Sequence, residues 1–379
     1  MEYKVINWDN LAVKVTIATF LSQAGITEYH AMIEVNNNNL SAEKQFNNIE
    51  ESINKLQESL GNASLVIKRY FVSDAVNQAD FLKKAPLDSA TSIVQQPPLN
   101  GSKVSVWTYW VSDSKVKTDS LGNCILERPA YKHLYSTQLQ KPMLNEYAET
   151  DYIFETYTET LKKYNCKLKD NCIRTWIYVQ GVDIHYRKMV EARSAYFERE
   201  DLTSDTHYIA STGIEGKHLD PNSLVLMDAY AIEGIEKEQI KYLQGLTHLN
   251  PTYEYGVTFE RATAVDYGDR RHIYVSGTAS IDNKGAIVYP TKIEKQIERT
   301  LENIEVLLAE GNAQMNDIAQ MIVYLRDTAD YEFVSSYMNK HYSSTPKVIV
   351  WAPVCRPGWL IEIECIAIKE IGDNGFECF

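Results

Sequence analysis

Two glutamates in an otherwise apolar stretch are the residues of this sequence best suited to chemistry. The stretch at 360–367 reads LIEIECIA and has the composition of a β-strand. Because side chains alternate along a strand, Glu362 and Glu364 fall on the same face. Burial and a neighbouring carboxylate both keep a carboxylic acid protonated near neutral pH. The pair therefore indicates a partly buried cleft that uses an acid, or else an exposed strand edge or an arginine-binding pair.

The chain has six cysteines, but their spacing does not indicate a metal site. None forms a C-x-x-C motif, and no histidine stands at zinc-finger spacing, so we expect no metal. Cys355 is followed by Arg356, a cation that would lower the pKa of a thiol. No histidine is evidently paired with Cys355, so a nucleophilic role for it is not favoured.

Composition excludes several classes of function. The 379 residues are 44% hydrophobic, which suffices for the cores of two or three ordinary domains. The formal net charge of −13 argues against a nucleic-acid partner, because phosphate binding needs clustered lysine and arginine. A local basic pocket for a small anion remains open. The N-terminus lacks a signal-peptide pattern and no apolar run spans a bilayer, so we expect a cytoplasmic protein with reduced thiols and no membrane partner.

One order of predicted elements, β-α-β-α-β-β, occurs three times along the chain. It is clearest in the third copy, where 271–282 predicts a strand ending in a glycine-containing turn and 292–312 an amphipathic helix. Tyr70, Tyr178 and Tyr324 fall at corresponding places on the middle strands. The main elements of the earlier copies are predicted at 41–62, 66–74 and 102–112, and at 146–165, 171–183, 184–200 and 224–232.

These copies predict three units at 1–112, 127–235 and 253–370, with polar connectors at 113–130 and 236–252. In each unit, two helices would cover one face of a mixed sheet, and the other face must be buried elsewhere. The sequence therefore predicts an α+β fold in which three tandem units form an intrachain pseudo-trimer with inward-facing sheets and outer helices. The alternative is a chance likeness between unrelated α+β units.

The third unit resembles the RidA (YjgF) superfamily, which is also described as endoribonuclease L-PSP-like. That family forms homotrimers with inward-facing sheets and a ligand cleft at each subunit interface. The resemblance implies that this chain is such a trimer linked into one polypeptide, a monomeric pseudo-trimer that is free to associate further. The motifs that carry it are VSGTASID at 275–282, Q-x4-L-x-N-I from Gln296, VYLRD at 323–327 and EIECIA at 362–367.

Units two and three together resemble the chorismatase branch of this superfamily. That branch protonates the enolpyruvyl methylene of chorismate and releases pyruvate by hydrolysis or rearrangement, which implies a small carboxylate ligand and no cofactor. The extra N-terminal unit is a departure from it. The matching segments are TWIY at 175–178, Tyr186 with Arg193, ASTGIEG at 210–216, SGTAS at 276–280 and CRPGWLIEIE at 355–364.

The resemblance also assigns candidate site residues. Glu362 matches the acid of the chorismatases, and Arg356 and Arg193 match arginines suited to a dicarboxylate. The backbone amides of the SGTAS segment would bind an oxyanion or carboxylate, or else form an ordinary tight turn. Cys355 would line the pocket. The remaining candidates are Gly277, Thr278, Ala279, Ser280, Lys347, Tyr178, Tyr324 and Glu364, with Tyr178 and Tyr324 as core residues or ligand contacts, and Arg326 as a weaker cation.

Two features depart from the family patterns. Lys347 stands where the RidA deaminases carry an arginine directly after a proline. The ammonium group of lysine is a point charge, whereas the guanidinium group of arginine presents paired donors to a carboxylate. The closing strands of units one and two lack the glutamate, and unit one lacks an SGTAS segment, so we expect one or two active clefts and a structural first unit. A RidA-type enamine or imine deaminase and a non-catalytic small-metabolite binding protein are the alternative functions.

Overall fold

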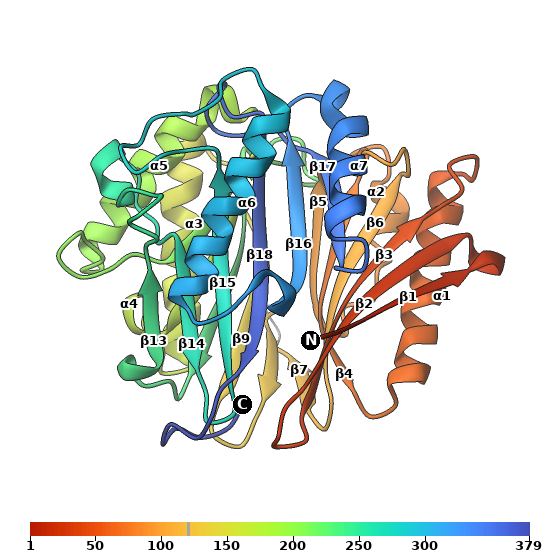
Figure 1. The fold of residues 1–379 in the computed structure, drawn as a ribbon, viewed down its shortest axis with the longest axis horizontal. Coiled ribbons are helices and arrows are strands. Elements are labelled where there is room, and N and C mark those ends of the chain that lie inside the picture. Colours follow the sequence, from red (N-terminus) through yellow and green to blue (C-terminus); the bar gives the residue numbers. More distant parts are fainter. Residues whose placement is uncertain (120–121) are drawn as a thin grey trace.

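Three six-stranded mixed sheets form the framework of the chain, which the computed structural model describes at residues 1–119 and 122–379 (Figure 1). In each sheet one pair of neighbouring strands is parallel and the others are antiparallel. Each parallel pair is joined by a helical crossover, as parallel pairing requires. The strand orders are β1-β2-β3-β6-β4-β5, β11-β10-β12-β9-β8-β7 and β13-β14-β15-β18-β16-β17.

The three sheets follow one another along the chain, and we call them with their helices units 1, 2 and 3. Unit 1 contains β1 (Glu2–Trp8), β2 (Val13–Leu21), β3 (Thr27–Val35), α1 (Ala42–Leu60), β4 (Ser64–Val72), α2 (Ala79–Leu82), β5 (Ala90–Gln95) and β6 (Val104–Val111). Unit 2 contains β7 (Lys115–Thr118), β8 (Cys124–Glu127), β9 (Lys132–Leu139), α3 (Glu146–Lys163), α4 (Leu168–Asn171), β10 (Cys172–Val179), α5 (Val182–Arg199), β11 (Ala210–Glu215) and β12 (Val225–Glu233). Unit 3 contains β13 (Ile240–Leu243), β14 (Ala262–Asp266), β15 (Arg270–Ala279), α6 (Ile293–Glu310), β16 (Ile318–Leu325), α7 (Tyr331–His341), β17 (Lys347–Trp351) and β18 (Ile361–Glu370).

The helices cover the outer faces of the sheets, and the inner faces meet in the middle of the molecule (Figure 1). In α6, Ile297, Leu301, Ile304 and Leu308 recur at helical spacing, and all four are buried against the sheet of unit 3. The predicted α+β fold of three tandem units with inward-facing sheets and outer helices is therefore confirmed.

Backbone bridges close the three units on one another where β5, β11 and β17 end. The amide of Gln95 donates to the carbonyl of Lys217, and the amide of Leu99 donates to that of Ile349, both at 2.9 Å. Ile214 and Val354 form the corresponding bridge between units 2 and 3. Each unit is thus tied to both of the others by main-chain contacts beside the interfaces.

The connectors predicted at 113–130 and 236–252 are in part wrong, because both contain edge strands. The strands β7 and β8 extend the sheet of unit 2, and β13 extends that of unit 3. Each has only four residues, and β7 is mostly exposed. Four residues are too few to produce a recognisable alternation of apolar and polar side chains.

The predicted correspondence of the three tyrosines is also wrong at Tyr70. Its hydroxyl bonds to Glu50 on α1, so it faces the outer helix. Tyr178 and Tyr324 are instead buried in the middle, near the guanidinium of Arg69. A shift of one residue turns a strand side chain to the opposite face, and here it places Arg69, and not Tyr70, on the inner face.

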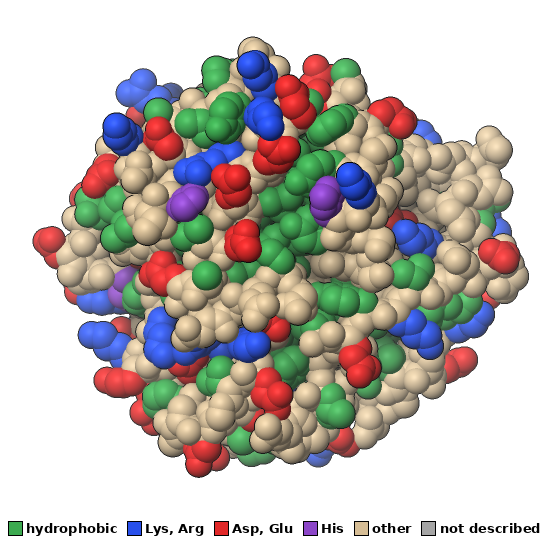
Figure 2. Space-filling view, viewed as in Figure 1, with side chains coloured by type: hydrophobic (Ala, Val, Ile, Leu, Met, Phe, Trp, Pro, Cys, Tyr) green, Lys and Arg blue, Asp and Glu red, His purple; other side chains and the backbone are tan. Residues whose placement is uncertain are grey.

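Acidic and basic side chains are interspersed over the face shown in Figure 2. Within the described ranges, no helix has the length and apolarity needed to cross a membrane.

Units 1 and 3 share a buried ion cluster. Arg270 of β15 bonds to Glu28 of β3 at 2.5 Å and to the adjacent Asp269 at 2.7 Å, and His272 lies 2.9 Å from Glu28. Burial would raise the pKa of Glu28, but His272 and Arg270 hold it well below its ordinary value. Glu28 is therefore ionised, and its negative charge in the core is stabilised by these two partners.

Arg270→Met should lower the free energy of unfolding by about 3–5 kcal/mol, because it leaves a buried carboxylate without its cation. Urea denaturation at neutral pH measures the change. Arg187→Met, which alters an exposed pair on α5, is the control and should change stability by less than about 1 kcal/mol. Equal stability of both variants would contradict the assignment of this cluster.

Candidate active site

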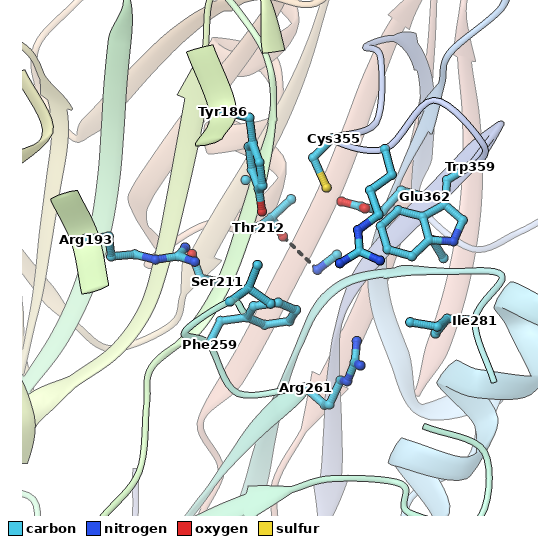
Figure 3. A pocket seen from close by; sticks show the side chains of 15 residues that line it. Tyr186, Arg193, Ser211, Thr212, Phe259, Arg261, Ile281, Cys355, Trp359 and Glu362 are labelled. Carbon is cyan, nitrogen blue, oxygen red and sulfur yellow. Dashed lines mark hydrogen bonds between the residues drawn. The ribbon is translucent and has the colours of Figure 1, made fainter. Parts of the chain in front are cut away.

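A pocket opens between units 2 and 3, and fifteen side chains line it (Figure 3). Helix α5 and strand β11 of unit 2 form one wall, and β15, β18 and the loop before β18 form the other. The empty space is about 520 Å³, with open solvent at the mouth included. The site therefore lies at an interface between units.

Glu362 lies at the inner end of this pocket. It is on β18, opposite Ala279 of β15 and Tyr324 of β16, and only 5% of its surface is exposed. Burial, and then the negative charge of Glu364, raise its pKa from 4.5 to about 8. Glu362 is therefore a carboxylic acid at neutral pH, with a proton to donate into the pocket.

Gly277 makes room for that carboxyl group. A Cβ atom placed on Gly277 would lie 2.1 Å from Oε1 of Glu362 and 3.1 Å from Cγ2 of Thr212. The amide of Gly277 donates to Oγ1 of Thr212 at 2.9 Å, which fixes the strand against unit 2 (Figure 3). A glycine at 277 thus allows the carboxyl of Glu362 to occupy this position, and a larger residue would displace it.

The turn predicted in the SGTAS segment is wrong. The strand β15 continues to Ala279 and is interrupted by a register shift between Val275 and Thr278. Glycine commonly marks such bulges. Gly277 and Ala279 line the pocket, whereas the hydroxyls of Thr278 and Ser280 bond to backbone carbonyls elsewhere. The amide of Gly277 donates to Thr212, so this one amide is not available to the predicted oxyanion or carboxylate.

Three guanidinium groups surround the pocket. Arg193 of α5 donates from Nε to Oγ1 of Thr258 at 3.2 Å, and Arg261 donates to the carbonyl of Asn250 at 2.9 Å. The guanidinium of Arg356 lies 5.0 Å from the ring centre of Trp359. Guanidinium groups bind carboxylates through paired hydrogen bonds, so three of them in the lining suit an anion with more than one carboxylate.

Cys355 is a neutral thiol in this pocket. Burial, and then the charge of Glu362, raise its pKa to about 12, and Tyr186 contacts its sulfur. As predicted, the charge of Arg356 acts to lower this pKa, but burial outweighs it. The thiol shapes the pocket and is not suited to act as a nucleophile.

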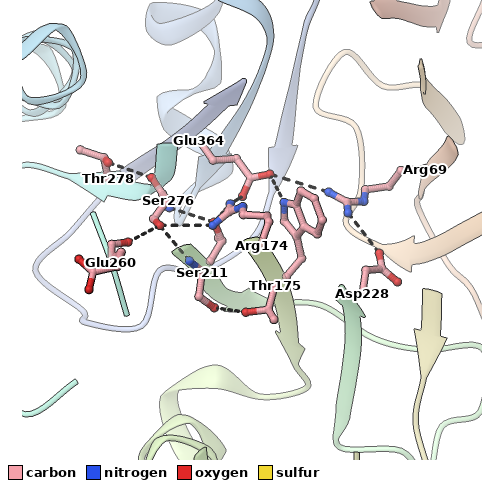
Figure 4. A network of polar contacts seen from close by, with 12 residues as sticks. Arg69, Arg174, Thr175, Ser211, Asp228, Glu260, Ser276, Thr278 and Glu364 are labelled. Carbon is pink, nitrogen blue, oxygen red and sulfur yellow. Dashed lines mark hydrogen bonds and ion pairs between the residues drawn. The ribbon is translucent and has the colours of Figure 1, made fainter. Parts of the chain in front are cut away.

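Glu364 points away from the pocket into a polar network that joins all three units (Figure 4). Its carboxylate accepts from Arg174 at 2.9 Å and from the indole of Trp176 at 2.8 Å, both on β10. Arg69 of β4 lies 3.8 Å from Glu364 and 3.2 Å from Asp228 of β12. This pairing fixes a negative charge two residues from Glu362.

The other predicted residues lie outside the pocket. Tyr178 and Tyr324 pack in the middle of the molecule around Arg69. Lys347 lines a separate cavity between units 1 and 3. Arg326 pairs with Asp183 on the surface at 2.6 Å. The structure thus brings together Glu362, Arg356, Arg193, Gly277, Ala279 and Cys355.

Several pocket residues were not among the predicted site residues. Thr212 and Tyr186 lie in segments already matched to the chorismatases, as does Trp359. Phe259 and Arg261 precede β14 and have no sequence signal except their place at the start of unit 3. Within residues 1–119 and 122–379, no group of three or more His, Cys, Asp and Glu side chains has the arrangement of a metal site.

Removal of the Glu362 carboxyl should flatten part of the pH dependence of stability. An acid with a raised pKa binds an extra proton in the folded state, so its contribution is full below pH 4.5 and disappears as the pH rises through about 8. Urea denaturation of wild type and Glu362→Gln at pH 5 and pH 9 measures this. The variant should lose less stability over the interval, and an identical loss would contradict the raised pKa.

Gly277→Ala should displace the carboxyl of Glu362 towards solvent and lower its pKa, because the new methyl group occupies the position of Oε1. Titration of 13C-labelled glutamate by NMR measures the change. Gly372→Ala is the matched control, since nothing lies within 4 Å of its Cβ position. An unchanged titration near pH 8 in Gly277→Ala would refute the close contact.

Comparison with known proteins agrees with this architecture. The family model described as Endoribonuclease L-PSP matches residues 261–369. A RutC family protein of Pyrococcus abyssi is 32% identical over 100 residues, which cover 26% of this chain and 79% of the relative. The 3-aminoacrylate deaminase RutC of Acinetobacter baylyi is 26% identical over 97 residues, 25% of this chain and 77% of the relative.

A crystal structure of a chorismatase resembles the chain over a much larger part. The TM-score is 0.63, and the match covers 80% of this chain and 93% of the chorismatase. The sequence identity is 17%, so this likeness shows the fold. Together with the matches to the third unit, it shows that the chain belongs to the RidA (YjgF) superfamily, as a single polypeptide of three tandem units.

Proposed function

We propose that this chain is an enzyme that protonates the methylene carbon of an enol ether and releases pyruvate from chorismate or a related small cyclic carboxylate. The observation that carries the proposal is the position of Glu362. It is a buried carboxyl group with a pKa of about 8, and it faces a pocket bordered by three arginines. The likeness of the fold to a chorismatase over 80% of the chain supports the same reaction.

The reaction begins with proton transfer from Glu362 to the terminal methylene of the enolpyruvyl group. The electron pair of the double bond forms the new C–H bond, and positive charge develops at the ether carbon. The carboxylate left on Glu362 stabilises that charge. Water then adds to the cation, and the resulting hemiketal breaks its C–O bond to give pyruvate and an alcohol. Hydrolysis thus consumes one water and returns the proton to the enzyme.

The three arginines bind and orient the substrate. Chorismate carries two carboxylates, and guanidinium groups bind carboxylates through paired hydrogen bonds. Arg193 comes from unit 2 and Arg356 from unit 3, so a substrate bound by both lies across the interface. Phe259 and Trp359 present apolar surface for the ring. Because its pKa is raised to about 8, Glu362 holds its proton at neutral pH and is ready to donate it when the substrate binds.

An enamine or imine deaminase is the second candidate, and one observation favours it. A curated relative of the third unit is named 3-aminoacrylate deaminase. Protonation of an enamine methylene needs the same kind of acid that Glu362 provides. Lys347 replaces the arginine of the RidA deaminases and lies in another cavity, which makes this the weaker proposal. The third candidate is a protein that binds a small carboxylate without turnover.

Glu362→Gln should lower pyruvate release from chorismate by about 10²–10⁴-fold, because the amide cannot supply the proton. Lactate dehydrogenase coupling measures pyruvate, and calorimetry measures chorismate binding. Glu370→Gln, on the exposed end of the same strand, should keep full activity. If the wild-type protein binds chorismate but releases no pyruvate, the proposal is overturned. If the wild type hydrolyses 2-aminoacrylate and Glu362→Gln does not, the deaminase is favoured.

A further inference from the structure

A second cavity lies between units 3 and 1. Helix α7 and strand β17 of unit 3 face β2 and β3 of unit 1 across it, as α5 and β11 of unit 2 face unit 3 at the candidate active site. The empty space is about 840 Å³, with open solvent at the mouth included. None of its lining residues belongs to the first pocket, so it is a separate site.

Three charged side chains line this cavity without pairing to one another. They are Lys14 of β2, Glu34 of β3 and Lys347 of β17. Within the described part of the chain, none of the three has an ion-pair partner within 4.0 Å, whereas the buried Arg270 and Arg174 are paired directly to carboxylates. Charged groups held apart around an empty space indicate a ligand that completes their interactions.

Lys347 is the most buried of the three. Its side chain is 9% exposed, and its ammonium nitrogen donates to the carbonyl of Tyr342 at 2.8 Å. Burial lowers the pKa of Lys347 to about 8. The negative charge of Glu34 opposes this shift, and the positive charge of Lys14 adds to it. Burial also raises the pKa of Glu34, although both lysines oppose this. Burial thus shifts Lys347 towards the neutral amine and Glu34 towards the carboxylic acid.

We propose that Lys347 forms a reversible Schiff base with a small 2-oxo acid whose carboxylate is bound by Lys14. The cavity suits a 2-oxo acid because the carbonyl carbon is the electrophile that a nucleophilic amine attacks. The carboxylate of the same molecule is an anion that pairs with the ammonium group of Lys14. The amide side chains of Asn36 and Asn100 line the same space and offer hydrogen bonds to the carboxylate. The inference does not depend on the reaction proposed for Glu362.

The covalent step is balanced within the cavity. The lone pair of the neutral amine forms a C–N bond with the carbonyl carbon, and the electron pair of the C=O bond moves to the oxygen. Proton transfer from nitrogen to oxygen gives a carbinolamine. A proton from Glu34 then goes to that hydroxyl, the C–O bond breaks, and water leaves as the nitrogen lone pair forms the C=N bond of a protonated imine, which returns its N–H proton to the Glu34 carboxylate. One amine and one carbonyl thus give one imine and one water, without an oxidant or reductant.

Reductive trapping tests the proposal directly. The full chain is incubated with pyruvate and sodium cyanoborohydride, and the modified lysines are identified by peptide mass spectrometry. The expected result is one reduced adduct on Lys347, with a yield that increases as the pH rises towards 8. Lys68 is the internal control, because it is as deeply buried but paired with Asp88 at 2.9 Å, and it should remain unmodified.

Two variants separate covalent capture from general lysine reactivity. Lys347→Arg should abolish the adduct, with folding confirmed by its melting temperature. Lys14→Gln should lower trapping of pyruvate by about tenfold or more, the effect of one charge-assisted hydrogen bond, but leave trapping of propanal unchanged. Absence of an adduct on Lys347 in wild type, or labelling of exposed lysines at the same rate, would overturn the proposal. An adduct trapped on Lys347 in Glu362→Gln would show that the Schiff base does not depend on the first site.

Discussion

The carboxylate of Glu364 is the fixed negative charge on which the candidate active site depends. Arg174 and Trp176 of unit 2 bind it directly, and Arg69 of unit 1 lies beside it. Because Glu364 is paired, the proton of this glutamate pair belongs to Glu362, which lies on the same strand face and has no such partner in the network. Burial at the interface supplies the larger effect on Glu362, and Glu364 adds to it.

The arrangement requires all three units. Unit 3 supplies Glu362 and Glu364 on one strand, unit 2 supplies Arg174 and the wall of the pocket, and unit 1 supplies Arg69. A symmetric trimer would repeat any change at every interface, whereas a single chain is free to change one interface alone. The two cavities differ in this way, because three arginines and Glu362 line one, whereas two lysines and Glu34 line the other.

Much of the fold could be predicted because its signals are long. The periodic helix at 292–312 and its counterpart at 41–62 correspond closely to α6 and α1. The short edge strands β7 and β13 could not be predicted, because four residues are too few to show a recognisable alternation of apolar and polar side chains. Tyr70 shows the limit of matching by residue type, because a shift of one position in a strand reverses the face.

The candidate site could be predicted only where a local pattern determines the side-chain position. Strand alternation placed Glu362 and Glu364 on one face, but only the structure shows one in the pocket and the other in the network. Arg261 reaches the pocket through tertiary packing, which no local pattern encodes. Cys355 was correctly predicted to line the pocket and Arg356 to lower its pKa, but burial, which cannot be read from neighbouring residues, outweighs the cation.

Neutron diffraction from deuterium-exchanged crystals at pH 7 tests the central claim most directly, because it locates the protons of the two glutamates. The account predicts nuclear density for deuterium on the carboxyl of Glu362 and none on Glu364, with the guanidinium of Arg174 fully deuterated. Deuterium on Glu364 with an ionised Glu362 would contradict it.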